Sequence, residues 1–216
     1  MTTDPTITGA FLAATDAPDP FQREQSIDAG RRSWDRIPAH YRGAVLDHPD
    51  AQEWVRSLVA AGLSRGAMVP RISRGPSLLL IGSTGTGKTH TAYGAIRALT
   101  SSGLSCSWEA ITAADLYGRL RPRHRVDSEV EFEPFLRCGV LVLDDLGAAK
   151  GSEWNEEINY RLINHRYEHE QPTLITSNVP PKDLASALGE RVSSRLREMA
   201  QRVVLRGGDR RKAGAA

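Results

Sequence analysis

Cysteine is scarce in this chain, since Cys106 and Cys138 are the two cysteines among its 216 residues. Two thiols that lie far apart in sequence are too few for a zinc site made of cysteines alone. They also do not form the dense pattern of a disulfide framework. We therefore expect both thiols to be reduced and to have structural roles.

Long apolar runs are also missing. No stretch approaches the roughly 20 apolar residues that a helix needs to cross a bilayer. The first ten residues, MTTDPTITGA, lack the basic-then-apolar order of a secretory signal. The sequence therefore predicts a cytoplasmic protein with no membrane partner.

The chain also lacks a large excess of either positive or negative charge. The chain has 28 Lys and Arg residues against 26 Asp and Glu residues, which gives a formal net charge of +2. This charge is too small for the whole surface to bind a polyanion, so any contact with nucleic acid must come from local clusters. Arg121 and Arg123 belong to one basic cluster, and residues 202–212 contain another. A solvated surface is the alternative interpretation of each.

The stretch from Gly82 to Thr89, GSTGTGKT, fits the phosphate-binding pattern GxxxxGK[ST]. It follows a short apolar run, residues 77–81, that predicts a buried strand, and precedes apolar residues at helical spacing. Its glycines let backbone N–H groups surround phosphate oxygens, Lys88 can reach the β and γ phosphates, and the Thr89 hydroxyl can ligand Mg²⁺. The sequence therefore predicts a site for ATP and Mg²⁺ rather than an empty glycine-rich turn. Its expected nucleotide-binding residues are Gly82, Ser83, Thr84, Gly85, Thr86, Gly87, Lys88, Thr89 and His90.

A second informative stretch, VLVLDDLG, begins at Val140 and ends at Gly147. A continuous apolar run followed by acids is typical of a strand in a parallel sheet that ends at the ligand-binding edge. We expect Asp144 to hold Mg²⁺ and Asp145 to orient or deprotonate the attacking water. A helix cap is the alternative role for these acids.

Residues 173–177, TLITS, predict another buried strand, and a polar residue lies at its tip. Asn178, at the end of this run, is a candidate to contact the γ-phosphate or the attacking water; its alternative is a turn residue before Pro180. Further along, Arg191 and Arg195 share one face of a predicted helix because they are four residues apart. We also expect a strand over Ser105–Ala110, helices over Ala113–Leu120 and residues 153–169, and a last strand over Arg202–Leu205.

Together these motifs resemble the AAA+ ATPases, and within them the DnaC/IstB-like group of helicase loaders and transposition helpers. The resemblance rests on GSTGTGKT, the DDLG that starts at Asp144, the TSN that ends at Asn178, and GERVSSRL from Gly189 to Leu196. It covers roughly residues 36–211. It implies a three-layer α/β P-loop fold with a central parallel sheet and without a full C-terminal helical lid.

The resemblance also implies roles for residues outside the P-loop. Asn178 takes the place of the family's sensor 1 residue. Arg195 takes the place of the arginine finger, which completes the ATP site of a neighbouring subunit, with Arg191 as the alternative. Asp145 departs from the more common glutamate, so slow ATP hydrolysis is expected.

The implied function is that of an ATP-dependent replicative helicase loader, which binds single-stranded DNA and a hexameric helicase and self-associates through a composite ATP site. Residues 1–35 are the expected flexible segment or helicase-docking element, residues 36–206 the ATPase core, and residues 207–216 a basic tail. DNA contacts are expected at Lys150, Ser152, Trp154, Arg121 and Arg123.

Other functions remain open. An IstB-like transposition helper would use the same ATP site, and a DNA-binding module with little hydrolysis would fit the aspartate at position 145. A small-molecule kinase is disfavoured because no stretch suggests an acceptor pocket or a mobile lid.

Overall fold

The computed structural model describes residues 19–64, 69–148 and 151–207. The chain divides into two compact units. Unit 1 lies within Met1–Gly75 and Thr89–Ser107, and unit 2 lies within Pro76–Lys88 and Trp108–Ala216. We describe each unit by itself.

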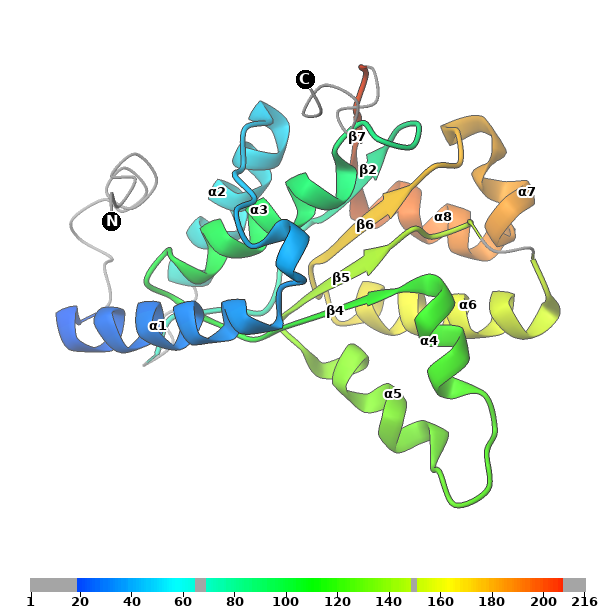
Figure 1. Cartoon of the computed structure of the whole chain (residues 1–216), viewed down its shortest axis with the longest axis horizontal. Helices are drawn as coiled ribbons and strands as arrows, with labels where there is room; N and C mark the ends of the chain where they lie inside the picture. The colour runs from blue at the N-terminus through cyan, green and yellow to red at the C-terminus, as the bar shows by residue number, and fades with distance from the viewer. Residues whose placement is uncertain (1–18, 65–68, 149–150, 208–216) are drawn as a thin grey trace. The chain divides into compact units, whose positions relative to one another are not determined.

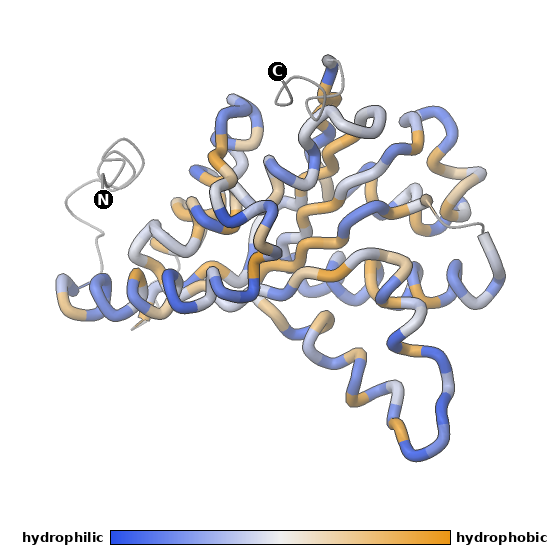
Figure 2. Tube along the Cα trace, in the orientation of Figure 1, coloured by the Kyte–Doolittle hydropathy of each residue, from blue (hydrophilic) through white to orange (hydrophobic). Residues whose placement is uncertain are grey.

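Unit 2 contains a five-stranded sheet in which all neighbouring strands are parallel. Its order is β4 (Trp108–Thr112), β5 (Val140–Asp144), β6 (Thr173–Ser177), β2 (Ser77–Ile81) and β7 (Ala200–Val204), and Figure 1 shows these strands side by side. Every residue of β2 and β6 is buried. This explains the continuous apolar run of residues 78–81 in β2, because a central parallel strand has no solvent-facing side. Figure 2 shows hydrophobic residues along strands of the sheet.

The helices of unit 2 are α4 (Ala113–Leu120), α5 (Ser128–Arg137), α6 (Glu153–Glu168), α7 (Leu184–Leu188) and α8 (Glu190–Met199), with a short 3₁₀ helix at Pro181–Asp183. Polar side chains cap three of them: Thr112, Asp127 and Ser152 accept hydrogen bonds from the first turns of α4, α5 and α6. Residues from all five α-helices pack with alternate residues of β2, β5 and β6 in one buried apolar core.

A buried arginine joins α6 to the sheet. Arg166 is fully buried, and its guanidinium donates to the Thr173 hydroxyl at 2.7 Å and to the carbonyl oxygens of Phe135, Cys138 and Pro172 at 2.8–3.2 Å. Burial lowers the pKa of this guanidinium. The contacts fix the end of α6 against the start of β6 and the end of α5.

Unit 1 contains α1 (Pro20–Ser33), α2 (Pro49–Leu63), α3 (Lys88–Thr100, of which all but Lys88 belongs to this unit) and a two-stranded parallel pairing of β1 (Arg71–Ile72) with β3 (Ser105–Cys106). Short 3₁₀ helices lie at Trp34–Arg36 and Ala39–Tyr41. The Trp34 indole donates to the Thr100 hydroxyl at 2.8 Å, and Arg97 lies over the Trp34 ring. These contacts attach the end of α1 to the end of α3.

The structure confirms most of the predicted elements and corrects two expectations. The predicted strand over Ser105–Ala110 is wrong as a single element, because β3 and β4 are separate strands that pair with different partners. Helix α1 was not predicted, although it occupies part of the expected flexible segment. Within the described residues, no helix is long and apolar enough to cross a membrane.

Candidate functional site

The loop that joins β2 to α3 has a backbone that only glycine readily adopts. Gly85 and Gly87 have φ angles of +86° and +94°, in the left-handed region. A Cβ atom at Gly82 would lie 2.6 Å from the carbonyl oxygen of Leu205 and 2.8 Å from Thr86 Oγ1. The loop is thus closely packed at its start and turns through its glycines before the helix begins at Lys88.

The Lys88 side chain lies across this loop and is only 6% exposed. Its Nζ atom donates to the carbonyl oxygens of Gly82 at 2.8 Å and Ser83 at 2.9 Å, and to Asn178 Oδ1 at 2.5 Å. A buried ammonium group needs such partners because desolvation is costly. Phosphate oxygens are a chemical match for the same group.

The two acids at the end of β5 lie beside the same polar cluster. Asp144 Oδ1 accepts a hydrogen bond of 2.5 Å from Thr176 Oγ1, and Asp145 Oδ1 accepts one of 3.2 Å from Asn178 Nδ2. Asn178 therefore contacts both Lys88 and Asp145. The structure brings four predicted site residues together where β2, β5 and β6 end, as expected for a parallel sheet.

These residues fit a nucleotide and a magnesium ion. The described residues contain no group of three or more His, Cys, Asp or Glu side chains that could hold a metal. Mg²⁺ does not require such a group, because it commonly uses one or two carboxylates together with substrate phosphates and water. Asp144 supplies a carboxylate, while the loop and Lys88 supply donors for phosphate.

Two predicted residues lie just beyond Lys88, in the first turn of α3. The structure places Thr89 and His90 in unit 1, so their proposed contacts with Mg²⁺ and nucleotide stay predictions. The Nε2 atom of His90 accepts a hydrogen bond of 3.2 Å from the backbone N–H of Val45. This contact assigns His90 a structural partner within its own unit.

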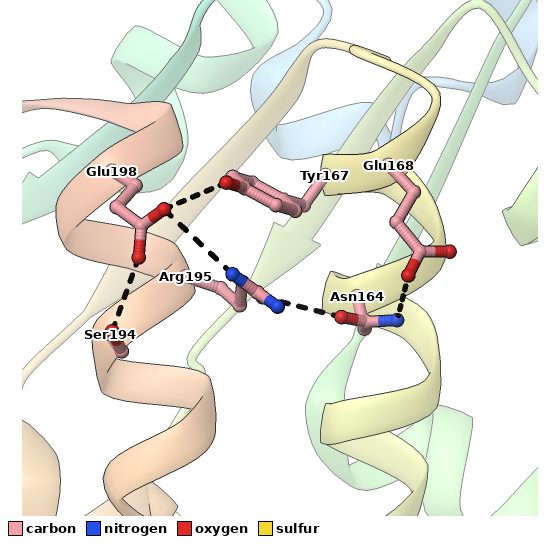
Figure 3. Close-up of polar contacts among 6 residues, drawn as sticks. All are labelled: Asn164, Tyr167, Glu168, Ser194, Arg195 and Glu198. Atoms are coloured by element: carbon pink, nitrogen blue, oxygen red, sulfur yellow. Dashed lines mark hydrogen bonds and ion pairs between the residues drawn. The ribbon is translucent and has the colours of Figure 1, made fainter.

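Arg195, the predicted arginine finger, lies on α8 and faces α6 (Figure 3). Its guanidinium is 4.3 Å from the centre of the Tyr167 ring, its Nε atom donates to Asn164 Oδ1 at 3.2 Å, and its Nη1 atom lies 3.8 Å from Glu198 Oε2. Hydrogen bonds from Tyr167 and Ser194 lower the pKa of Glu198, which keeps this carboxylate charged. Arg195 is thus held on the α6–α8 face rather than joined to the Lys88 cluster by any contact among the described residues.

The alternative finger, Arg191, is exposed and lies 5.5 Å from the centre of the Tyr160 ring. Both arginines therefore contact tyrosines of α6. The choice between them stays a prediction.

The expected DNA-binding residues have different surroundings. Trp154 is half-buried against the apolar core and meets Tyr117 edge-on, with 6.3 Å between ring centres, which indicates a packing role. Arg121 and Arg123 are exposed between α4 and α5, and Arg123 donates to the carbonyl oxygen of Arg119. Lys150 lies outside the described residues, and Ser152 caps α6.

Sequence reasoning gave no role to Thr176, the first residue of the quoted TSN motif, whose hydroxyl contacts the end of β5. Its signal was the run of three polar residues at 176–178, but the partner of each residue depends on the register between the two strands. That register is not visible in the sequence.

Comparisons with known proteins agree with this geometry. The sequence model of the family described as IstB-like ATP binding protein matches residues 54–205, which is more than half of the chain. The replicative helicase loader DnaC of Escherichia coli K12 is 27% identical over 124 residues, and that of Buchnera aphidicola from Acyrthosiphon pisum is 29% identical over 125 residues. Each match covers 56% of this chain and 50% of the relative, so the chain aligns with about half the length of these curated relatives.

Solved structures show the same fold. A crystal structure of the DnaC helicase loader has a TM-score of 0.62 and 30% identity, with 78% of this chain and all of that chain covered. AMPPCP-bound DnaA from Aquifex aeolicus has a TM-score of 0.60 and 18% identity, with 82% of this chain but 54% of that chain covered. These likenesses confirm the predicted P-loop AAA+ fold with its central parallel sheet. The chain belongs to the family of IstB-like ATP binding proteins.

Proposed function

We propose that this protein is an ATP-dependent, DnaC-like replicative helicase loader that acts in the cytoplasm during the initiation of DNA replication. The observation that carries the proposal is the hydrogen-bonded cluster of Lys88, Asn178 and Asp145, with Asp144 beside it, at the ends of three parallel strands. The likeness to DnaC helicase loaders supports the choice of biological role.

Each residue of the cluster has a chemical role in ATP hydrolysis. Lys88 and the loop N–H groups would bind the β and γ phosphates, and Asp144, with Thr89, would hold Mg²⁺. Bound Mg²⁺ would neutralise charge on the phosphates. Asp145 would orient a water molecule for attack, and Asn178, already bonded to Lys88 and Asp145, would contact the γ-phosphate or that water.

Hydrolysis would require a neighbouring subunit. Arg195 has its partners on α6 and α8, on the surface of unit 2, and would contact the nucleotide of an adjoining copy. ATP turnover would then depend on self-association.

Single-stranded DNA and a hexameric helicase are the proposed partners. The exposed Arg121 and Arg123 are candidates for contacts with DNA phosphates, and residues 1–35 are the candidate helicase-docking segment. DnaA bound to AMPPCP and single-stranded DNA shares the fold at 20% identity, with a TM-score of 0.59.

An IstB-like transposition helper is the second candidate, and the matching family model favours it. It would use the same ATP site with a transposase as partner. Affinity capture with the full chain, and with residues 1–35 removed, separates the two. Recovery of a replicative helicase only by the full chain supports the loader, whereas recovery of a transposase supports the helper.

The ATP site itself is tested by Lys88→Ala. Because this change removes the ammonium group from the loop, we expect ATP binding, measured by isothermal titration calorimetry, to fall below detection. Lys182→Ala is the matched control, since Lys182 is exposed in the 3₁₀ helix before α7. Equal ATP affinity for Lys88→Ala and the wild type would contradict the proposed site.

A further inference from the structure

Thr176, the fourth residue of β6, makes three hydrogen bonds with three consecutive residues, the last residue of β5 and the two that follow it. Its hydroxyl donates to Asp144 Oδ1 at 2.5 Å and accepts from the backbone N–H of Asp145 at 2.9 Å. Its carbonyl oxygen accepts from the N–H of Leu146 at 2.9 Å. The residue is fully buried, so these bonds are shielded from water.

The Thr176 hydroxyl accepts from a backbone N–H beyond the point where the regular pairing of β5 with β6 ends. The paired register of β5 and β6 ends with Leu143 opposite Ile175. Asp145 then has a φ angle of +56°, a left-handed conformation that is uncommon for a residue with a side chain. The bond from its N–H to Thr176 holds this conformation in place.

The two bonds of the hydroxyl have a fixed direction. The Asp145 N–H can only donate, so the Thr176 oxygen must accept there, and its single proton is directed to Asp144. A hydroxyl that donates to a carboxylate stabilises the charged form and fixes its orientation. One side chain thus fixes both the orientation of the Asp144 carboxylate and the backbone conformation at Asp145.

We propose that Thr176 is a positioning residue for the magnesium and hydrolysis site, and that it acts through Asp144 and Asp145. The inference rests on the proposed function, because it assigns Asp144 to Mg²⁺ and Asp145 to the attacking water. Loss of a group that orients a metal ligand typically costs about 10- to 100-fold in metal affinity or activity. The Lys88 Nζ atom bonds to Gly82, Ser83 and Asn178, which the change at Thr176 leaves in place, so nucleotide binding without metal is expected to persist.

Thr176→Val tests the proposal because valine has nearly the shape of threonine but no hydroxyl. The measurement is the affinity of the full chain for AMPPCP, a non-hydrolysable ATP analogue, as Mg²⁺ is varied. We expect the affinity without Mg²⁺ to equal that of the wild type. The Mg²⁺ concentration for half of the metal-dependent gain should rise about 10- to 100-fold, and kcat for ATP should fall by a similar factor.

Thr176→Ser provides the rescue, since it keeps the hydroxyl. Its Mg²⁺ dependence should lie within about threefold of the wild type, because the same bonds can form. If serine shifts the Mg²⁺ dependence as much as valine does, the hydroxyl is not the cause and the proposal is overturned.

Thr173→Val is the matched control. Thr173 lies in the same strand and is equally buried, but its hydroxyl accepts from Arg166. We expect a lower melting temperature with an unchanged Mg²⁺ dependence. An equal shift in Mg²⁺ dependence would show that weakening β6 is sufficient and would overturn the positioning role.

The wild-type protein separates this inference from the proposed function. Wild-type ATP binding that does not depend on Mg²⁺ would overturn the proposed metal site, and the inference with it. Mg²⁺-dependent AMPPCP binding by the wild type, with the same dependence in Thr176→Val, would overturn the inference alone.

Discussion

At the scale of single residues, the interior of unit 2 contains a cation without a carboxylate among its recorded hydrogen-bond partners. The Arg166 guanidinium bonds to the Thr173 hydroxyl and to three backbone carbonyl oxygens. Neutral acceptors satisfy its donors, and in turn the guanidinium donates to carbonyl groups at the end of α5 and just before β6. The residue joins three elements through directed bonds rather than through apolar packing.

Arg166→Met should therefore destabilise the protein strongly. Methionine fills much of the volume but removes the guanidinium that donates to the carbonyl oxygens of Phe135, Cys138 and Pro172, of which Pro172 keeps a bond from the Leu141 N–H. Each buried polar group left unsatisfied costs about 1–3 kcal/mol. We expect the free energy of unfolding, measured by chemical denaturation, to fall by about 3 kcal/mol or more.

Arg161→Met is the control for this change. Arg161 forms an ion pair with Glu129 in which the two side chains are 40% and 66% exposed, so its loss should cost less than about 1 kcal/mol. A similar loss of stability in the two variants would contradict the role given to Arg166.

Residues with a sequence motif were predictable, whereas residues defined by their partners were not. Lys88, Asp144 and Asn178 occur in fixed patterns at the ends of apolar runs, and the structure brings them together. Thr176 lies in the quoted TSN motif but received no role, and Arg166 lies in no motif, because the partners of both come from strands and helices that only the folded chain brings close.

At the scale of elements, two helical glycines have opposite surroundings. In α1, a Cβ atom at Gly30 would lie 2.2 Å from the carbonyl oxygen of Thr100, at the end of α3. In α4, a Cβ atom at Gly118 would meet nothing within 4 Å. Helix α1 therefore approaches α3 at a distance that only glycine allows.

Alanine should destabilise one helix and stabilise the other. Gly118→Ala should raise the free energy of unfolding by about 0.5–1 kcal/mol, because alanine is the better helix former. Gly30→Ala should lower it by about 1–3 kcal/mol, since overpacking outweighs the same gain. Thermal and chemical denaturation measure the change in the free energy of unfolding of each variant. A stabilised Gly30→Ala protein would refute the packing of α1 on α3.

The same contact explains why α1 was missing from the sequence prediction. The buried residue of α1 is Gly30, and most other residues of this helix are polar, so the sequence shows little apolar pattern at helical spacing. The strand predicted over residues 105–110 failed for a related reason. Local composition favours extended chain on both sides of Ser107. The residues before it pair with β1 and those after it pair with β5, so the stretch is divided between two sheets.

At the scale of the whole molecule, the proposed ATPase is incomplete in one chain. In the proposed function the Lys88 cluster would supply phosphate, metal and water contacts, while Arg195 bonds to Asn164 and stacks on Tyr167. A second copy would bring an Arg195 to the nucleotide of the first. Activity should then depend on protein concentration.

Mixing two inactive variants tests this arrangement. Arg195→Ala should retain ATP binding but lose turnover by on the order of 10³-fold, because the transition-state charge loses its guanidinium partner. Asp145→Asn should also be inactive. A mixture should regain turnover in a phosphate-release assay, since an intact Asp145 site can receive Arg195 from its neighbour.

Arg197→Ala is the matched control, because Arg197 is an exposed arginine on the same helix. It should hydrolyse ATP at the wild-type rate. A mixture that stays inactive, or an Arg197→Ala protein as impaired as Arg195→Ala, would count against a finger supplied by a neighbouring copy.

Binding of a nucleotide would require Lys88 to exchange hydrogen bonds with protein oxygens for hydrogen bonds with phosphate oxygens. Its ammonium group already holds two carbonyl oxygens of its own loop and the amide oxygen of Asn178. An arriving triphosphate would compete with these oxygens, and transfer of the bond that Lys88 makes with Asn178 would release the amide whose Nδ2 atom donates to Asp145. Asn178 would thereby couple the occupancy of the loop to the acid that follows β5.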